Sequence, residues 1–111
     1  MGSPMVRPVS PQALASLLHE NPPKVFLLDV REPEERTTAA IEPSTHIPMD
    51  DVEAHLAEIP RDRPVVVYCH HGTRSYMIAS FLESEGYEDV GSLTGGIDAW
   101  SERVDPKVPQ Y

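Results

Sequence analysis

The chain is 111 residues long, 40% hydrophobic and 24% charged, which is typical of a single globular domain with its own core. Its net charge of −9 argues against general nucleic-acid binding, which requires a basic surface. No apolar stretch approaches the roughly 20 residues of a membrane-spanning helix, so we expect no membrane association.

The first part of the chain alternates between strand-like and helix-like segments. Residues 1–4 precede Met5 and resemble a remnant of cloning, so the domain is expected to start at Met5. A helix is expected after Ser10 and Pro11, which form an N-cap and N1 pair. Two flanking strands are predicted from apolar runs, at 6–9 and 25–30.

The middle of the chain contains the most hydrophobic strand. Residues 33–36 are expected to form a helical turn at most, and 45–47 a short strand. An aspartate at position 50 or 51 can cap a helix that ends at Pro60. The apolar run 65–68 is then predicted to be the buried central strand of a parallel sheet.

The last third continues the same alternation. Three elements are predicted, a helix, a strand and a helix, at 75–84, 89–93 and 97–100. Gly86 is suited to end the first of these helices. We place the domain at 5–104 and expect residues 105–111 to form an extended C-terminal tail. Strands and helices alternating at this spacing predict an α/β fold with a parallel sheet.

The only cysteine, Cys69, directly follows the predicted central strand. Ligands of parallel sheets bind at the carboxyl ends of the strands, where Asp29 also lies. A thiol between a strand end and a helix start lies among backbone N–H donors and near the positive end of the helix dipole, which favours a nucleophilic thiolate. Gly72 allows the loop amides to turn inward and form a nest. With one cysteine an internal disulfide is excluded, and a reducing, cytoplasmic compartment is expected.

The segment after the cysteine carries local positive charge. It contains His70, His71 and Arg74, and no carboxylate lies between residues 64 and 81. An acidic protein with a locally positive pocket is suited to a small anion, and Arg74 offers a fork-shaped donor for an oxyanion. The histidines either shape this site or face solvent.

Four segments of the chain together resemble the single-domain rhodanese-like sulfurtransferases. They are LLDVREPEE at 27–35, HIP at 46–48, VVYCHHGTRS at 66–75 and LTGGIDAW at 93–100. The resemblance covers most of the chain and implies a five-stranded parallel sheet flanked by helices on both faces. Residues 37–44 depart from the family pattern, which usually has Gly-His-Ile and a later Gly-Ala here, so the conformation of this connection is left open.

The resemblance also implies an activity. In this family a loop cysteine takes a sulfane sulfur from a donor such as thiosulfate and passes it to cyanide or a thiol, including the thiol of a small redox protein. Cys69 would carry the persulfide, held by the residues that follow it: His70, His71, Gly72, Thr73, Arg74 and Ser75. We expect no cofactor and a monomer. We also expect no metal, since adjacent histidines in a tight loop rarely point at one ion.

Two other functions are weighed against sulfur transfer. Related phosphatases and arsenate reductases place an arginine six positions after the cysteine, whereas here Arg74 comes one residue earlier and Ser75 follows it. The shorter loop fits a sulfur atom better than a phosphate. The second alternative is a non-catalytic module that binds an anion or a protein, and the intact loop with Cys69 argues against it.

Asp29 and Arg31 lie at the end of the predicted 25–30 strand. We expect them to pair with each other or with loop backbone, either as a structural pair or as support beneath the active loop.

Overall fold

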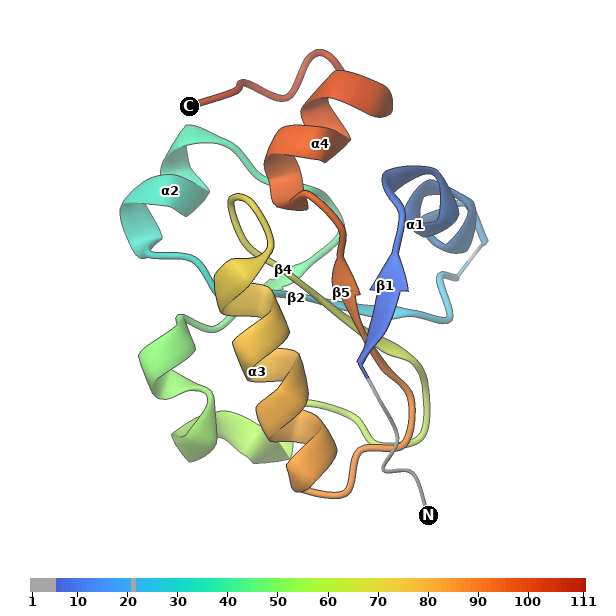
Figure 1. The fold of residues 1–111 in the computed structure, drawn as a ribbon, viewed down its shortest axis with the longest axis vertical. Helices are drawn as coiled ribbons and strands as arrows, with labels where there is room; N and C mark the ends of the chain where they lie inside the picture. The colour runs from blue at the N-terminus through green and yellow to red at the C-terminus, as the bar shows by residue number, and fades with distance from the viewer. Residues whose placement is uncertain (1–5, 21) are drawn as a thin grey trace.

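A five-stranded parallel sheet forms the centre of the fold, in the order β1-β5-β4-β2-β3 (Figure 1). The computed structural model describes residues 6–20 and 22–111, so the predicted cloning remnant at 1–4 lies outside the described residues. The strands are β1 (Arg7–Val9), β2 (Phe26–Asp29), β3 (Thr45–His46), β4 (Val65–Tyr68) and β5 (Val90–Leu93). The predicted α/β fold with a parallel sheet is confirmed.

Strand β4 is buried on both faces, as its continuous apolar sequence predicts. Val65 and Val67 point into one core cluster, whereas Val66 and Tyr68 point into the other. Because side chains alternate along a strand, these four residues contribute to both hydrophobic layers at once. Cys69 follows at the carboxyl end of this strand, in the middle of the sheet.

Helices cover both faces of the sheet (Figure 1). One face is covered by α3 (Thr73–Ser84) and two 3₁₀ helices, η1 (Met49–Asp51) and η2 (Glu53–Glu58). The other face is covered by α1 (Pro11–Leu18) and α4 (Gly96–Arg103). Within the described residues, every helix is too short or too polar to traverse a bilayer.

Two helical segments differ from the sequence-based prediction. The expected single turn at 33–36 is a six-residue helix, α2 (Pro33–Thr38), which begins with a capping box between Glu32 and Glu35. The expected helix before Pro60 is the pair η1 and η2, with non-helical dihedral angles at His55. Apolar side chains of this segment still pack in the core, but its backbone forms the tighter turns of 3₁₀ helices.

The connection at 37–44 is held by two side chains that come from strand ends. Arg31 Nη2 donates to the carbonyl of Ala39 at 2.6 Å, and the amide of Ile41 donates to Tyr68 Oη at 3.1 Å. Ile41 is itself buried, and a cis peptide bond joins Glu42 to Pro43. Although its sequence departs from the family pattern, this connection is packed against the sheet.

Residues 104–111, which follow α4 without forming a further helix or strand, are held against the domain by hydrogen bonds. The amide of Asp105 donates to the carbonyl of Trp100 at 3.0 Å, and the amide of Val108 closes a turn on Asp105 at 3.0 Å. Ser101 Oγ on α4 donates to the carbonyl of Val108. These contacts lead the chain back across α4, and its end lies beside α2 (Figure 1).

Candidate active site

Cys69 lies in a cradle of backbone donors. Its residue is 1% exposed, and its Sγ accepts hydrogen bonds from the amides of Gly72 at 3.1 Å and Ser75 at 3.3 Å. Gly72 has φ +120°, a conformation that favours glycine. Helix α3 begins at Thr73, two residues earlier than predicted, so the Ser75 amide is a first-turn N–H with no partner inside the helix. Such donors stabilise an anion on sulfur.

Two of the predicted backbone donors contact the unmodified sulfur. Of the amides from His70 to Ser75, two donate to Sγ in the described structure, and they belong to Gly72 and Ser75. Thr73, Arg74 and Ser75 are the first residues of α3 rather than loop residues. The helix start therefore supplies half of the observed cradle.

Two serines form a polar contact beneath the sulfur. The thiol of Cys69 donates to Ser75 Oγ at 3.5 Å, and Ser75 Oγ lies 2.7 Å from Ser92 Oγ on β5. Both serines are buried. Sequence reasoning did not single out Ser92, although a serine in a buried strand is a usable signal because buried hydroxyls need a partner.

The start of α4 holds the cysteine from the other side. The amide of Ile97 donates to the carbonyl of Cys69 at 2.9 Å, and that of Asp98 to the carbonyl of His70 at 3.2 Å. Gly96 makes this approach possible, because a Cβ there would lie within 3.0 Å of both carbonyl oxygens. Gly96, the first residue of α4, thus helps to position the cysteine loop, which we define as Cys69–Gly72.

Arg74 is paired with Glu35 of α2, a residue for which the sequence patterns predicted no role. Its two guanidinium nitrogens donate to the two carboxylate oxygens at 2.6 and 2.9 Å. The Arg74 hydrogen bonds hold the pKa of Glu35 at about 2, and the same pair raises the pKa of Arg74. The expectation of a locally positive pocket counted only carboxylates near in sequence, and Glu35 offsets the charge of Arg74.

This pair makes stability depend on pH. Since the pKa of Glu35 falls from its ordinary value of 4.5 to about 2 on folding, the unfolded state takes up the proton first as pH falls. The stabilisation is complete above about pH 5 and is lost as the pH falls towards about 2. We expect the free energy of unfolding to fall less steeply over this window in Glu35→Gln than in the unsubstituted protein.

Urea unfolding curves of both proteins across this range would measure the difference. The pKa of Asp29 is also lowered, but Asp29 is present in both proteins, so its contribution cancels when the two unfolding free energies are compared. Parallel curves for the two proteins would contradict the assignment to Glu35.

Asp29 and Arg31 form the predicted pair, and both side chains are fully buried. Arg31 Nε and Nη2 each donate to the Asp29 carboxylate at 2.9 Å. Burial alone would raise the pKa of Asp29, but bonds from Arg31 and Arg36 outweigh it and lower that pKa. Tyr68 Oη donates to the same carboxylate at 3.2 Å. The pair anchors the end of β2.

His70 and His71 stack on each other, with ring centroids 3.9 Å apart. Burial and the neighbouring His71 lower the pKa of His70, and its Nε2 is buried without a hydrogen-bond partner among the described residues. His71 is exposed and lies 3.9 Å from the Asp98 carboxylate. Candidate ligand atoms of His70, His71 and Asp98 lie within 4.8 Å of one another. The absence of a metal stays a prediction.

Comparison with known proteins assigns this site to a family. A model of the rhodanese-like domain matches residues 10–103. The chain belongs to the rhodanese-like domain family. It is 36% identical to a sulfurtransferase of Allochromatium vinosum, over 94% of this chain and 96% of the relative. It is also 36% identical to the thiosulfate sulfurtransferase GlpE of Tolumonas auensis, over 83% and 85% of the two chains.

A solved structure supports the same family. The reduced Bacillus anthracis CoADR-RHD has a TM-score of 0.83 and 30% identity to this rhodanese-like domain. The similarity covers 93% of this chain and 18% of that chain.

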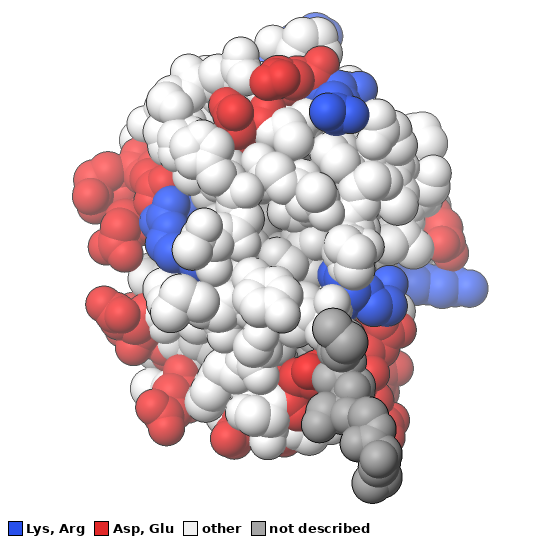
Figure 2. All heavy atoms as spheres, viewed as in Figure 1, with Lys and Arg blue, Asp and Glu red and all other residues white. Residues whose placement is uncertain are grey.

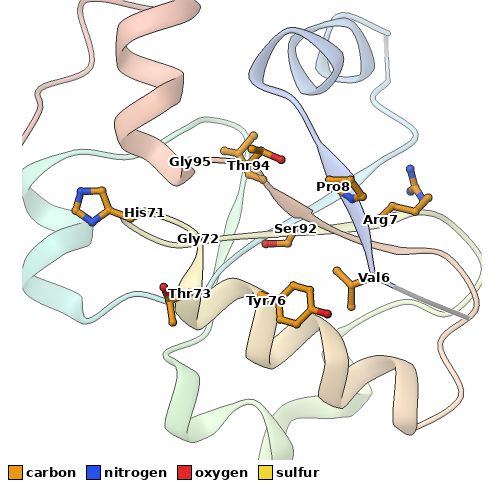
Figure 3. Close-up of a pocket in the computed structure, with 11 residues that line it drawn as sticks. Val6, Arg7, Pro8, His71, Gly72, Thr73, Tyr76, Ser92, Thr94 and Gly95 are labelled. Atoms are coloured by element: carbon orange, nitrogen blue, oxygen red, sulfur yellow. The ribbon is translucent and has the colours of Figure 1, made fainter. Parts of the chain in front are cut away.

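A cavity of about 460 Å³ opens beside the cysteine loop of this rhodanese-like domain (Figure 3). It lies between α3, β5 and β1, and its lining includes Gly72, Thr73, Tyr76 and Ser92. Ser92, which lines the cavity, also contacts the buried Ser75 beneath the sulfur.

The surface on this side of the rhodanese-like domain is largely uncharged. Figure 2 shows acidic and basic side chains around the rim of the face and few at its centre. Arg7, which lines the cavity, is paired with Asp89. The exposed apolar side chains Tyr76 and Met77 lie on α3, next to the start of the helix.

Proposed function

We propose that Cys69 of this sulfurtransferase carries a persulfide that moves sulfane sulfur from a small donor to a thiol or cyanide. The observation that carries the proposal is the Sγ of Cys69 at the end of β4, which accepts two amide hydrogen bonds. The names of the A. vinosum and T. auensis relatives support sulfur transfer, and the second supports thiosulfate as a donor.

In the first half-reaction the Cys69 thiolate attacks the outer sulfur of thiosulfate. A sulfur–sulfur bond forms on Cys69, the bond within thiosulfate breaks, and sulfite leaves with the electron pair. The amides of Gly72 and Ser75 favour the thiolate before the attack.

In the second half-reaction cyanide or a thiolate attacks the terminal sulfur of the persulfide. The new bond yields thiocyanate or an acceptor persulfide, and the electron pair of the broken bond returns to Cys69 as a thiolate. The chain has no second cysteine, so no internal thiol can resolve the persulfide. The sulfur must therefore be passed to another molecule, and a small redox protein is one acceptor with the required thiol.

An anionic donor such as thiosulfate would find both arginines near the site already paired. Arg74 is engaged by Glu35, and Arg31 by Asp29, so an anionic donor would depend on backbone amides for its binding. The uncharged face around the cavity is suited to a thiol acceptor. A lone catalytic thiol is suited to a reducing, cytoplasmic compartment.

The experiment that tests the proposal is mass spectrometry of the intact protein after a single exposure to thiosulfate. We expect the mass to rise by one sulfur atom, the added sulfur to map to the peptide containing Cys69, and cyanide or a thiol to remove it. A protein that turns over thiosulfate without forming this adduct would contradict the persulfide mechanism.

A further inference from the structure

The segment 104–111 places an aromatic ring against the cysteine loop. Tyr111 stacks on His70 with the ring centroids 3.9 Å apart and the planes 8° from parallel. His70 directly follows Cys69 in the chain. The segment therefore covers the residue next to the candidate nucleophile, and nothing in the local sequence of 105–111 indicates this position.

Polar contacts fix the Tyr111 hydroxyl. It accepts a hydrogen bond from Arg31 Nη1 at 2.8 Å and donates to Glu35 Oε2 at 2.7 Å. Burial raises the pKa of Tyr111 to about 12, so the hydroxyl keeps the proton that it donates. Along the segment, Gln110 Nε2 donates to Asp98 Oδ1 at 3.1 Å. The segment is thus held at several points along its length.

The covering contacts can open without dismantling the site beneath them. The bonds between Arg31 and Asp29, and those between Arg74 and Glu35, do not involve Tyr111. Tyr111 itself is 40% exposed. The buried His70 Nε2 has no partner in the covered arrangement, and it would gain water if Tyr111 moved away.

The cavity lies on another side of the cysteine loop. Its lining includes His71, Gly72 and Thr73, but not His70 or Tyr111. Figure 1 shows the end of the chain beside α2, whereas the cavity lies between α3 and β1. One approach to the loop is therefore open and the other is covered.

We propose that segment 104–111 is a lid on the cysteine loop, and that Tyr111 limits the size of the sulfur donors and acceptors that reach Cys69. This assignment rests on the sulfur-transfer function proposed above. Small molecules reach the sulfur with the lid closed, and bulky thiols react through the fraction of molecules in which it is open. Tyr111 is a specificity-determining residue that acts by position and forms no bond to sulfur.

Alkylation of Cys69 tests the lid without any assumption about sulfur transfer. Because the chain has one cysteine, the reaction of iodoacetamide and of a polyethylene-glycol maleimide reports on Cys69 alone. Access through a minor open state scales with its population, so Tyr111→Ala should raise the maleimide rate relative to the iodoacetamide rate by about 3- to 10-fold. Tyr111→Phe, which keeps the ring but loses both hydroxyl bonds, should fall between this variant and the unsubstituted protein.

Lys107→Ala is the matched control, since it changes an exposed side chain of the same segment. We expect it to leave the ratio of the two alkylation rates unchanged. If Tyr111→Ala also leaves that ratio unchanged, the lid proposal is overturned and Tyr111 only supports the fold.

A second measurement connects the lid to substrates. With glutathione persulfide and thiosulfate as bulky and small donors, Tyr111→Ala should shift the ratio of their kcat/KM values several-fold towards glutathione persulfide, in the same direction as the alkylation ratio. An unchanged kcat/KM ratio would overturn the specificity role. Failure of the proposed function would look different: no transfer from either donor by the unsubstituted protein, with the alkylation ratio still dependent on Tyr111.

Discussion

Replacement of Cys69 by serine is expected to lower sulfur transfer from thiosulfate by on the order of 10³-fold or more. A serine hydroxyl is not ionised near neutral pH, and it cannot hold the sulfur as a persulfide. The hydroxyl can keep the hydrogen bonds from Gly72 and Ser75, so the loop should remain in place. Steady-state release of sulfite and thiocyanate would measure the loss.

Thermal unfolding of Cys69→Ser supplies the control. Its melting temperature should lie within about 5 °C of the unsubstituted protein, because the substitution is small and preserves polar partners. A variant that is folded and still transfers sulfur at the original rate would show that donor and acceptor react without a persulfide on Cys69.

Gly96→Ala is expected to displace the cysteine loop although it lies outside that loop. The added Cβ would press on the carbonyl oxygens of Cys69 and His70, and Gly96 has φ +63°, where a side chain is strained. We expect kcat/KM to fall by about 10²-fold, as for a catalytic group moved by an ångström. The free energy of unfolding should fall by about 1–3 kcal/mol.

Gly86→Ala is the matched control for Gly96→Ala. Gly86 also has a positive φ, of +95°, but a Cβ there would meet only the end of the Arg61 side chain, at 3.4 Å. It should therefore destabilise the protein through backbone strain and leave kcat/KM unchanged. Equal losses of activity in the two variants would mean that the α4 start does not position the loop.

Sequence patterns predicted those parts of the fold that depend on local periodicity. The apolar run at 65–68 became the central strand, and Ser10 caps α1 by accepting the Ala13 amide at 3.0 Å. The same patterns did not indicate where 105–111 would lie, because Tyr111 contacts Glu35 of α2, which is 76 residues away in sequence. They also missed the break at His55, where tertiary packing overrides helical spacing.

The sequence predicted the nucleophile of the candidate site, but it did not predict which charged groups surround that nucleophile. Cys69, Gly72 and Ser75 are brought together within one strand-to-helix turn, so their proximity follows from adjacency in the chain. Glu35 lies 39 residues from Arg74, and its carboxylate offsets the positive charge that the sequence places there. Charge pairing depends on distance in space, and that distance was unknown from the sequence.

By itself, the sequence determined that a single thiol would stand at the carboxyl end of a central parallel strand, next to the start of a helix. Hydrophobic periodicity and turn residues act over a few positions, which is why this could be read directly. Only the tertiary structure decided what surrounds that thiol. Folding brings Glu35 onto Arg74, Gly96 under the carbonyls of Cys69 and His70, and Tyr111 over His70. These contacts arise between elements that meet only when the sheet and its helices have packed.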